Sequence, residues 1–152
     1  MQIQKLKKLI SKILIKHNLY KKDAEICTKA LINAELVGAP SHGVSRLKMY
    51  CERINKKVIN PKPKIKIKRV TNSVSLINAD NSIGFVAADT GIKETIKIAK
   101  KTGIAFVGIK NSGHYGLSGY YIEQAVKKNL LAFAFTNAPP AIAPHGLSLI
   151  HI

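Results

Sequence analysis

Residues 71–109, TNSVSLINADNSIGFVAADTGIKETIKIAKKTGIAFVGI, contain the pattern that decides the fold. The first part, TNSVSLINAD at 71–80, is predicted to be a strand, and apolar residues at helical spacing then run from Gly84 to Lys101. The last part, GIAFVGI at 103–109, is a short apolar run of the kind found in buried strands. Strand, helix and strand joined by short loops are typical of an α/β layer. We therefore expect this stretch to begin such a layer.

The pattern extends in both directions along the chain. Toward the end, residues 117–128 are predicted to be helical, and LLAFAFT at 130–136 is predicted to be a second buried strand. Before residue 71, the prolines in NPKPKIKIKRV at 60–70 exclude a helix. The alternation of isoleucine and lysine there predicts a strand with one solvated face, paired with 71–80.

Three helices are predicted before the first strand. The first carries apolar residues at helical spacing, which are Ile3, Leu6, Ile10, Ile13 and Leu14. The second runs from Asp23, a suitable N-cap, to Leu36, and Gly38 then ends it. The third begins at Ser41 and carries Leu47, Tyr50, Cys51 and Ile54 on or near one face. The predicted fold class is α/β, with a helical unit at 1–58 followed by a mixed α/β domain at 59–146.

The composition of the chain indicates which kinds of molecule it could bind. The net charge of +17 suggests nucleic acid or an anionic surface, yet only three of the 25 basic residues are arginines, the residue that nucleic-acid sites favour. General surface charge is therefore the favoured interpretation. The two cysteines, Cys27 and Cys51, are too few for a disulfide framework or a zinc site, and we expect no metal. With no signal peptide and no apolar stretch long enough to span a bilayer, the expected location is the cytoplasm.

The stretch APSHGVSRLKMY at 39–50 suggests a site for a carboxylate. On a helix that begins at Ser41, His42 and Arg46 would share one face, because residues four apart are neighbours. Ser41 would cap the helix, and Arg46 would grip both oxygens of an acid. His42 could then exchange a proton with a neighbouring carbonyl or hydroxyl. The alternative is purely structural, with Ser41 as a cap and Arg46 paired to a surface acid.

His114 lies in a second candidate loop, NSGHYGLSGYY at 111–121. Ligands in open α/β sheets collect beyond the carboxyl ends of strands, and this loop follows the predicted strand at 103–109. Its glycines allow a ligand to approach the backbone closely. The alternative is a turn whose histidine bonds to nearby backbone. The loop NAPPAIAPHG at 137–146 follows the next predicted strand in the same way.

Four ordered motifs connect the chain with a known family. They are SHGVSRL at 41–47, NADNSIGFVAA at 78–88, NSGHYGLSGYY at 111–121 and TNAPPAIAPHG at 136–146. With them the chain resembles, from the first helix to about Gly146, the malate/L-lactate dehydrogenase family that is unrelated to the Rossmann-type lactate and malate dehydrogenases. The resemblance implies a non-Rossmann mixed α/β fold, for which a GxGxxG motif is not expected. It also implies hydride transfer between NAD or NADP and C2 of a small 2-hydroxy or 2-oxo acid.

The resemblance also implies roles for particular residues. Ser41 and His42 match the family's Ser-His pair, in which the histidine is proposed as proton donor. Arg46 matches the basic residue that handles the substrate, and His114 matches the histidine assigned as proton acceptor in some members. Members differ over which histidine does the work.

The same resemblance extends to the cofactor and to assembly. Thr136, Asn137 and Ala138 match a loop that approaches the nicotinamide. The family's active site lies near a dimer interface, so a homodimer is expected of the full-length protein, with a small carboxylate as substrate. Which acid is used, and NAD versus NADP, stay open at this stage.

The last six residues, LSLIHI at 147–152, do not fit the family. They can be read from the end sequence of a transposon adapter used in DNA library preparation, so we expect a non-native tail. Family members are roughly twice as long as this chain. We therefore expect a fold that is incomplete at the C-terminus, and a fragment that is inactive by itself.

Two other functions stay open beside the enzyme. A basic nucleic-acid-binding module is supported by the charge alone. A non-catalytic interaction domain would use Ser41, His42 and His114 only for capping and packing. We expect neither nucleic acid nor a membrane as a partner.

Overall fold

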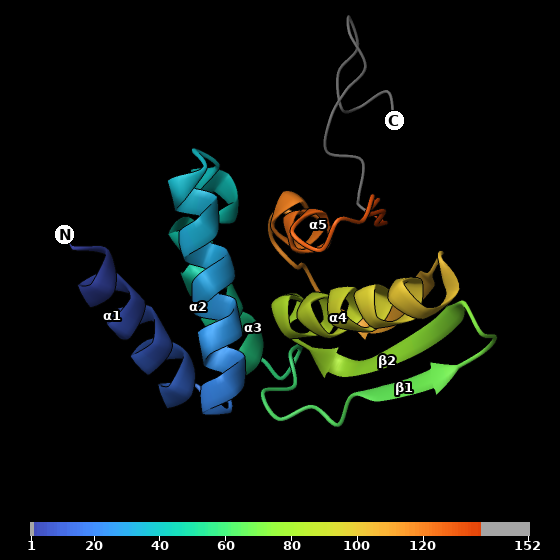
Figure 1. Ribbon diagram of the computed structural model, residues 1–152. Helices are drawn as coiled ribbons and strands as arrows, with labels where there is room; N and C mark the ends of the chain where they lie inside the picture. Colours follow the sequence, from blue (N-terminus) through green and yellow to red (C-terminus); the bar gives the residue numbers. More distant parts are fainter. Residues whose placement is uncertain (1, 138–152) are drawn as a thin grey trace, which may run out of the picture.

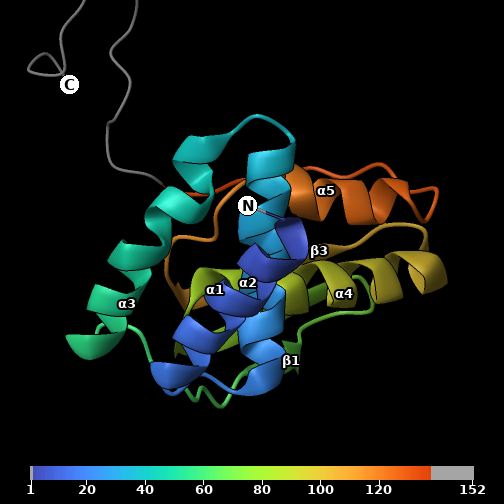
Figure 2. The same cartoon turned by 90° about the vertical axis from the view of Figure 1, so that its left-hand side faces the viewer.

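The computed structural model describes residues 2–137, and three α-helices come first in the chain. They are α1 (Ile3–Lys16), α2 (Lys21–Leu36) and α3 (Leu47–Asn55). Figure 1 shows them side by side at one end of the molecule, and Figure 2 shows α1 in front of α2 when this end faces the viewer. The helical N-terminal part predicted from the sequence is confirmed in its order of elements. The domain boundary at residue 58 remains a prediction.

The second part is the predicted α/β layer. It contains β1 (Lys66–Arg69), β2 (Val74–Ser82), α4 (Gly84–Thr102), β3 (Phe106–Ser112) and α5 (Gly119–Val126). The sheet order is β1-β2-β3, with β1 antiparallel and β3 parallel to β2. Helix α4 packs on one face of this sheet, and α5 lies over α4 on the side away from the sheet (Figure 1). The strand, helix, strand order read from residues 71–109 is therefore confirmed.

One hydrophobic core joins the helices to the start of α4. Leu14 of α1, Leu31 of α2 and Tyr50 of α3 belong to the same buried cluster as Phe85 and Val86 of α4. The Tyr50 and Phe85 rings meet edge to face, with centroids 5.0 Å apart. Such aromatic pairs add to the stability that burial alone gives. The core therefore fixes α3 against α4. The candidate site is built beside these two helices.

Two helix starts differ from the prediction. Helix α2 begins at Lys21 with Tyr20 at the N-cap, so Asp23 lies in the first turn and caps nothing. The segment from Ser41 forms two 3₁₀ turns, η1 (Pro40–His42) and η2 (Val44–Arg46), and the α-helix begins only at Leu47. The extended ψ of −144° at Gly43 interrupts the helical geometry there, so Ser41 is not the cap of α3. The predicted stop at Gly38 is confirmed, with φ at +76°.

The two strands expected to be buried are not buried in the described part of the chain. Residues 106–112 do form β3, but Phe106 is 64% exposed because β3 pairs only with β2 among residues 2–137. Residues 130–136 form no strand, and Leu131, Phe133 and Phe135 are 95%, 83% and 86% exposed. Alternating apolar residues favour a strand, but a strand forms only where a neighbouring strand supplies hydrogen bonds.

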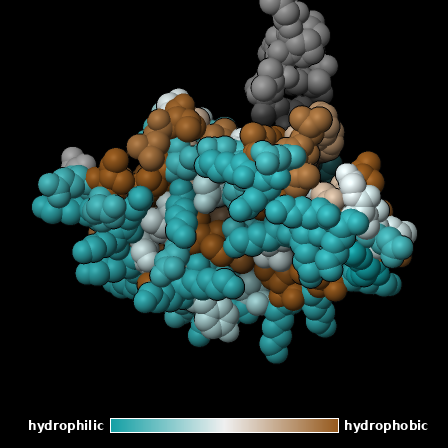
Figure 3. Space-filling view, viewed as in Figure 1, coloured by the Kyte–Doolittle hydropathy of each residue, from teal (hydrophilic) through white to brown (hydrophobic). Residues whose placement is uncertain are grey.

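The surface mixes hydrophilic and hydrophobic side chains in the view of Figure 3. Figure 3 shows hydrophilic side chains spread over much of one face, with hydrophobic side chains between them. Among the described residues no helix is both long and apolar enough to cross a bilayer.

Candidate active site

The turn that carries His42 is built against the end of α2. The backbone N–H of Val44 donates to Oε1 of Glu35 at 2.7 Å, and the Gly43 N–H donates to the Pro40 carbonyl at 3.0 Å. A Cβ at residue 43 would overlap the Glu35 carboxylate, so a larger residue there would require this side chain to move. Glu35 and Gly43 therefore fix the path of residues 40–46. Neither residue was identified from the sequence.

Ser41, His42 and Arg46 lie close together, though not as predicted. They do not share the face of an α-helix, because each stands in a 3₁₀ turn. Instead, Oγ of Ser41 lies 3.0 Å from Nδ1 of His42, and Nε of Arg46 donates to the Ser41 carbonyl at 2.6 Å. The Ser-His pair is thus a direct hydrogen bond, and Arg46 is held beside it by the backbone.

His114 approaches this pair from the other part of the fold. It follows β3, and its ring stacks on that of His42 with centroids 5.8 Å apart and planes at 28°. The start of α4 allows this approach, because a Cβ at Gly84 would collide with the backbone of Gly113 and His114. Two histidines from distant parts of the sequence are therefore neighbours, beside Arg46.

The Tyr50 hydroxyl contacts the His114 ring. Its hydroxyl lies 2.6 Å from Nδ1 of His114, and the side chain is only 1% exposed. The sequence predicted Tyr50 on one face of the third helix with Leu47 and Ile54, and the structure buries these three residues together, but the contact of Tyr50 with His114 was missed. The available signal was general, since the hydroxyl of a buried tyrosine usually finds a hydrogen-bond partner.

Burial and nearby charges shift the pKa values of His114 and Tyr50. Burial lowers the pKa of His114, and the nearby His42, Arg46 and Arg53 lower it further. Burial raises the pKa of the Tyr50 hydroxyl, so it keeps its proton at physiological pH. The site therefore combines a neutral imidazole with cationic neighbours, which is a setting that attracts a small anion.

The residues predicted to approach a nicotinamide lie at the end of the described chain. Thr136 and Asn137 are exposed, and Oγ1 of Thr136 donates to the Asn137 carbonyl at 3.2 Å. Ala138 lies outside the described residues. The hydroxyl and amide of this pair have the chemistry to hold the carboxamide of a nicotinamide. No contact joins Thr136 or Asn137 to the His42–His114 pair, so the structure leaves their predicted role untested.

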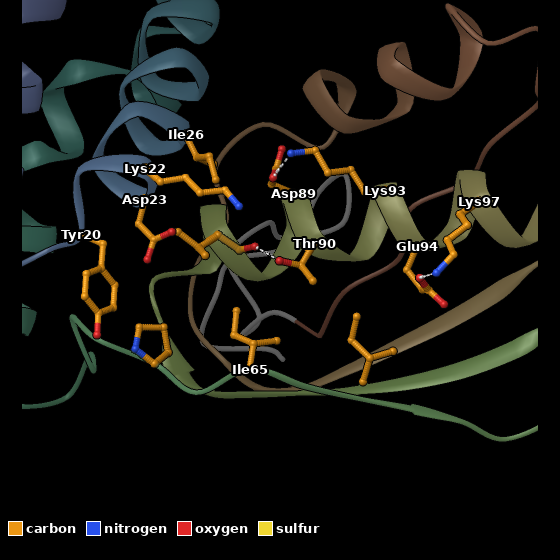
Figure 4. Close-up of a pocket in the computed structure, with 13 residues that line it drawn as sticks. Tyr20, Lys22, Asp23, Ile26, Ile65, Asp89, Thr90, Lys93, Glu94 and Lys97 are labelled. Carbon is orange, nitrogen blue, oxygen red and sulfur yellow. Dashed lines mark hydrogen bonds and ion pairs between the residues drawn. The ribbon is translucent and has the colours of Figure 1, made fainter.

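A separate hollow of about 490 Å³ lies between α4, β1 and the start of α2. Figure 4 shows Asp89 bonded to Lys93 and Glu94 facing Lys97 on its α4 side. The two contacts measure 2.6 Å and 3.6 Å. Because its residues include none of the candidate histidines and these acids are paired, we assign it no chemistry.

Within residues 2–137, no three His, Cys, Asp or Glu side chains group closely enough to hold a metal ion. Cys27 is fully buried in α2, and Cys51 is half-buried in α3.

Comparison with known proteins gives one consistent result. The family model described as malate/L-lactate dehydrogenase matches residues 1–148. The chain is 39% identical over 138 residues to the malate/(S)-sulfolactate dehydrogenase of Methanothermus fervidus, covering 91% of this chain and 41% of that protein. It is 33% identical over 141 residues to the NAD⁺-linked ureidoglycolate dehydrogenase of Escherichia coli O157:H7, covering 93% and 40% of the two chains.

The fold agrees with these sequence matches. The malate dehydrogenase structure from Pyrococcus horikoshii OT3 superposes with a TM-score of 0.82 at 38% identity. That match covers 84% of this chain and 37% of the other. The chain thus spans about two fifths of the length of the curated relatives that it matches.

Proposed function

Because the chain belongs to the malate/L-lactate dehydrogenase family, we propose that the whole protein transfers a hydride between a nicotinamide cofactor and C2 of a small acid. The substrate is a 2-hydroxy or 2-oxo acid such as malate or lactate. The observation that carries the proposal is the stacked pair of His42 and His114 beside Arg46. A carboxylate and a carbonyl on adjacent carbon atoms match a cation next to groups that donate or exchange protons.

Each residue has a part in this proposal. Arg46, held by the Ser41 carbonyl, attracts the carboxylate of the substrate. His42, bonded through Nδ1 to Ser41, and His114 act on the oxygen at C2. The bound cofactor supplies or accepts the hydride, while the protein supplies binding, orientation and protons.

NAD or NADP is the proposed cofactor, with Thr136, Asn137 and Ala138 as the loop near the nicotinamide. The donor and acceptor groups of Thr136 and Asn137 support this assignment. We expect the 152-residue chain by itself to have no dehydrogenase activity, because its relatives are more than twice as long.

The proposed setting is a cytoplasmic homodimer whose partner is the small carboxylate substrate, without nucleic acid or membrane. The scarcity of arginine supports the exclusion of nucleic acid, because nucleic-acid sites favour arginine and only three of the 25 basic residues are arginines. A binding assay against duplex DNA and RNA at low and high salt checks this exclusion. Tight binding with a steep loss at high salt would contradict it.

The function is tested by following NADH and NADPH oxidation by the complete protein with matched substrates. We expect turnover with oxaloacetate and pyruvate, and none with ketones of similar size that lack the carboxylate. Arg46→Lys should raise KM for the acid, because a lysine cannot grip both carboxylate oxygens. Equal turnover of ketones and 2-oxo acids, or none with either, would overturn the proposal.

A further inference from the structure

A tyrosine hydroxyl and a backbone N–H converge on one nitrogen of His114. The Tyr50 hydroxyl lies 2.6 Å from Nδ1, and the backbone N–H of Gly116 points at the same nitrogen from 3.4 Å. A backbone N–H can only donate, so Nδ1 meets it with a lone pair rather than a proton. A neutral imidazole carries a single proton, which this arrangement leaves on Nε2.

Both groups are fixed by packing against Phe85. The Tyr50 ring meets Phe85 edge to face at 5.0 Å and is 1% exposed. Gly116 has φ at +77°, and a Cβ there would lie 2.5 Å from Cε1 of Phe85. The positions of the Tyr50 hydroxyl and the Gly116 N–H are thus set by the core, independently of any bound molecule.

The charged groups around His114 favour its neutral form. His42 stacks on it from η1, and Arg46 and Arg53 lie near enough to lower its pKa, together with partial burial. Tyr50 keeps its proton because burial raises the pKa of the hydroxyl. The Tyr50 O–H therefore has a proton to donate, and Nδ1 has the lone pair to accept it.

We propose that Tyr50 is a positioning residue that holds His114 as a neutral ring with its proton on Nε2. His114 then acts as a fixed hydrogen-bond donor to the C2 oxygen of the substrate, and His42 exchanges the proton. The inference rests on the proposed function for the substrate, although the state of the ring does not depend on it.

The different roles of His114 and His42 follow from the number of protons that each ring can give up. If neutral His114 gave up its Nε2 proton, it would become an imidazolate, and Tyr50 cannot readily replace that proton. His114 therefore keeps its N–H and polarises the carbonyl. In reduction, C2 gains the hydride from the reduced nicotinamide, and the electron pair of the C=O π bond moves to oxygen. That oxygen takes the Nε2 proton from the doubly protonated, imidazolium form of His42, which is left neutral with its Nδ1 still facing Ser41. Oxidation reverses each transfer.

The test is ¹⁵N NMR of the histidine side chains in the 152-residue chain, with His114→Gln used to assign the signals. At pH 7.5 we expect His114 to show an unprotonated Nδ1 and a protonated Nε2. Tyr50→Phe should raise the share of the Nδ1–H form about fivefold, because one neutral hydrogen bond shifts an equilibrium by about that factor. Tyr20→Phe, at a tyrosine that is 52% exposed, is the matched control and should leave the His114 signals unchanged.

Two results would overturn the inference. One is a neutral His114 in the wild-type chain that carries its proton mainly on Nδ1, and this readout needs no variant to fold. The other is a folded Tyr50→Phe variant whose His114 signals do not move. In the active complete protein, we expect His42→Gln to remove a titration from the pH profile of kcat/KM, whereas His114→Gln lowers kcat and keeps that titration. Absence of any activity, with the NMR result as expected, would refute the proposed function alone.

Discussion

The loop that carries His114 approaches the start of α4 closely at Gly84. Replacing Gly84 with alanine should push this loop away from the helix. The added Cβ would collide with the Gly113 carbonyl and the backbone of His114. These atoms belong to the main chain, so no flexible side chain can turn aside to make room. We expect Gly84→Ala to lower the free energy of unfolding by about 1–3 kcal/mol, the usual penalty for overpacking.

A matched control exists in the same part of the molecule. Gly119 begins α5, and a Cβ there meets nothing within 4 Å. Gly119→Ala should be neutral or stabilise the protein by up to about 1 kcal/mol, because alanine favours a helix over glycine. Urea denaturation of both variants, followed by circular dichroism, makes the comparison. Equal stability of the two variants would refute the reasoning that Gly84 is required for the close approach.

Three further outcomes follow from the same structure. Burial and nearby cations lower the pKa of His114 in the folded state, so as pH falls below 6.5 this histidine is protonated in the unfolded chain before it is protonated in the folded chain. The folded state therefore loses stability in this pH range. The urea midpoint of the wild type should therefore fall more between pH 7.5 and 5.5 than that of His114→Gln, and equal falls would count against this. Glu35→Ala should destabilise the fold by about 1 kcal/mol through loss of the Val44 hydrogen bond, whereas Glu35→Gln should recover most of it in the same urea assay. Iodoacetamide should label the half-buried Cys51 before the fully buried Cys27 in the native chain, as mass spectrometry would show, and the reverse order would contradict the packing.

The order of helices and strands could be predicted because it depends on local periodicity. The apolar spacing in Ile3–Lys16 and Gly84–Thr102 is that of a helix in any context, and both helices are present. Burial could not be predicted in the same way, since it depends on what covers an element. Residues 103–109 have the composition of a central strand, yet β3 has one exposed edge among the described residues. Residues 130–136 alternate like a strand and form none.

The candidate site could also be predicted only in part. Ser41, His42 and His114 could be selected from the sequence because their residue types and motifs suggest chemistry, and the structure brings them together. Their geometry could not be predicted, because it depends on contacts that are distant in sequence. The bond from Tyr50 to His114 joins α3 to the loop after β3, and no spacing within either segment indicates it.

The central claim is that His42 and His114 act together on one substrate of a nicotinamide-dependent dehydrogenase. The most direct test is kcat/KM of the complete protein with NAD(P)H and its preferred 2-oxo acid, for His42→Gln, His114→Gln and His17→Gln. His17, which bonds to the Ile13 carbonyl in the helical part, is the control. We predict a loss of at least about a hundredfold for His42 and His114, the scale of a positioned acid, base or hydrogen-bond donor, and almost none for His17. Activity that survives replacement of either His42 or His114 would contradict the account.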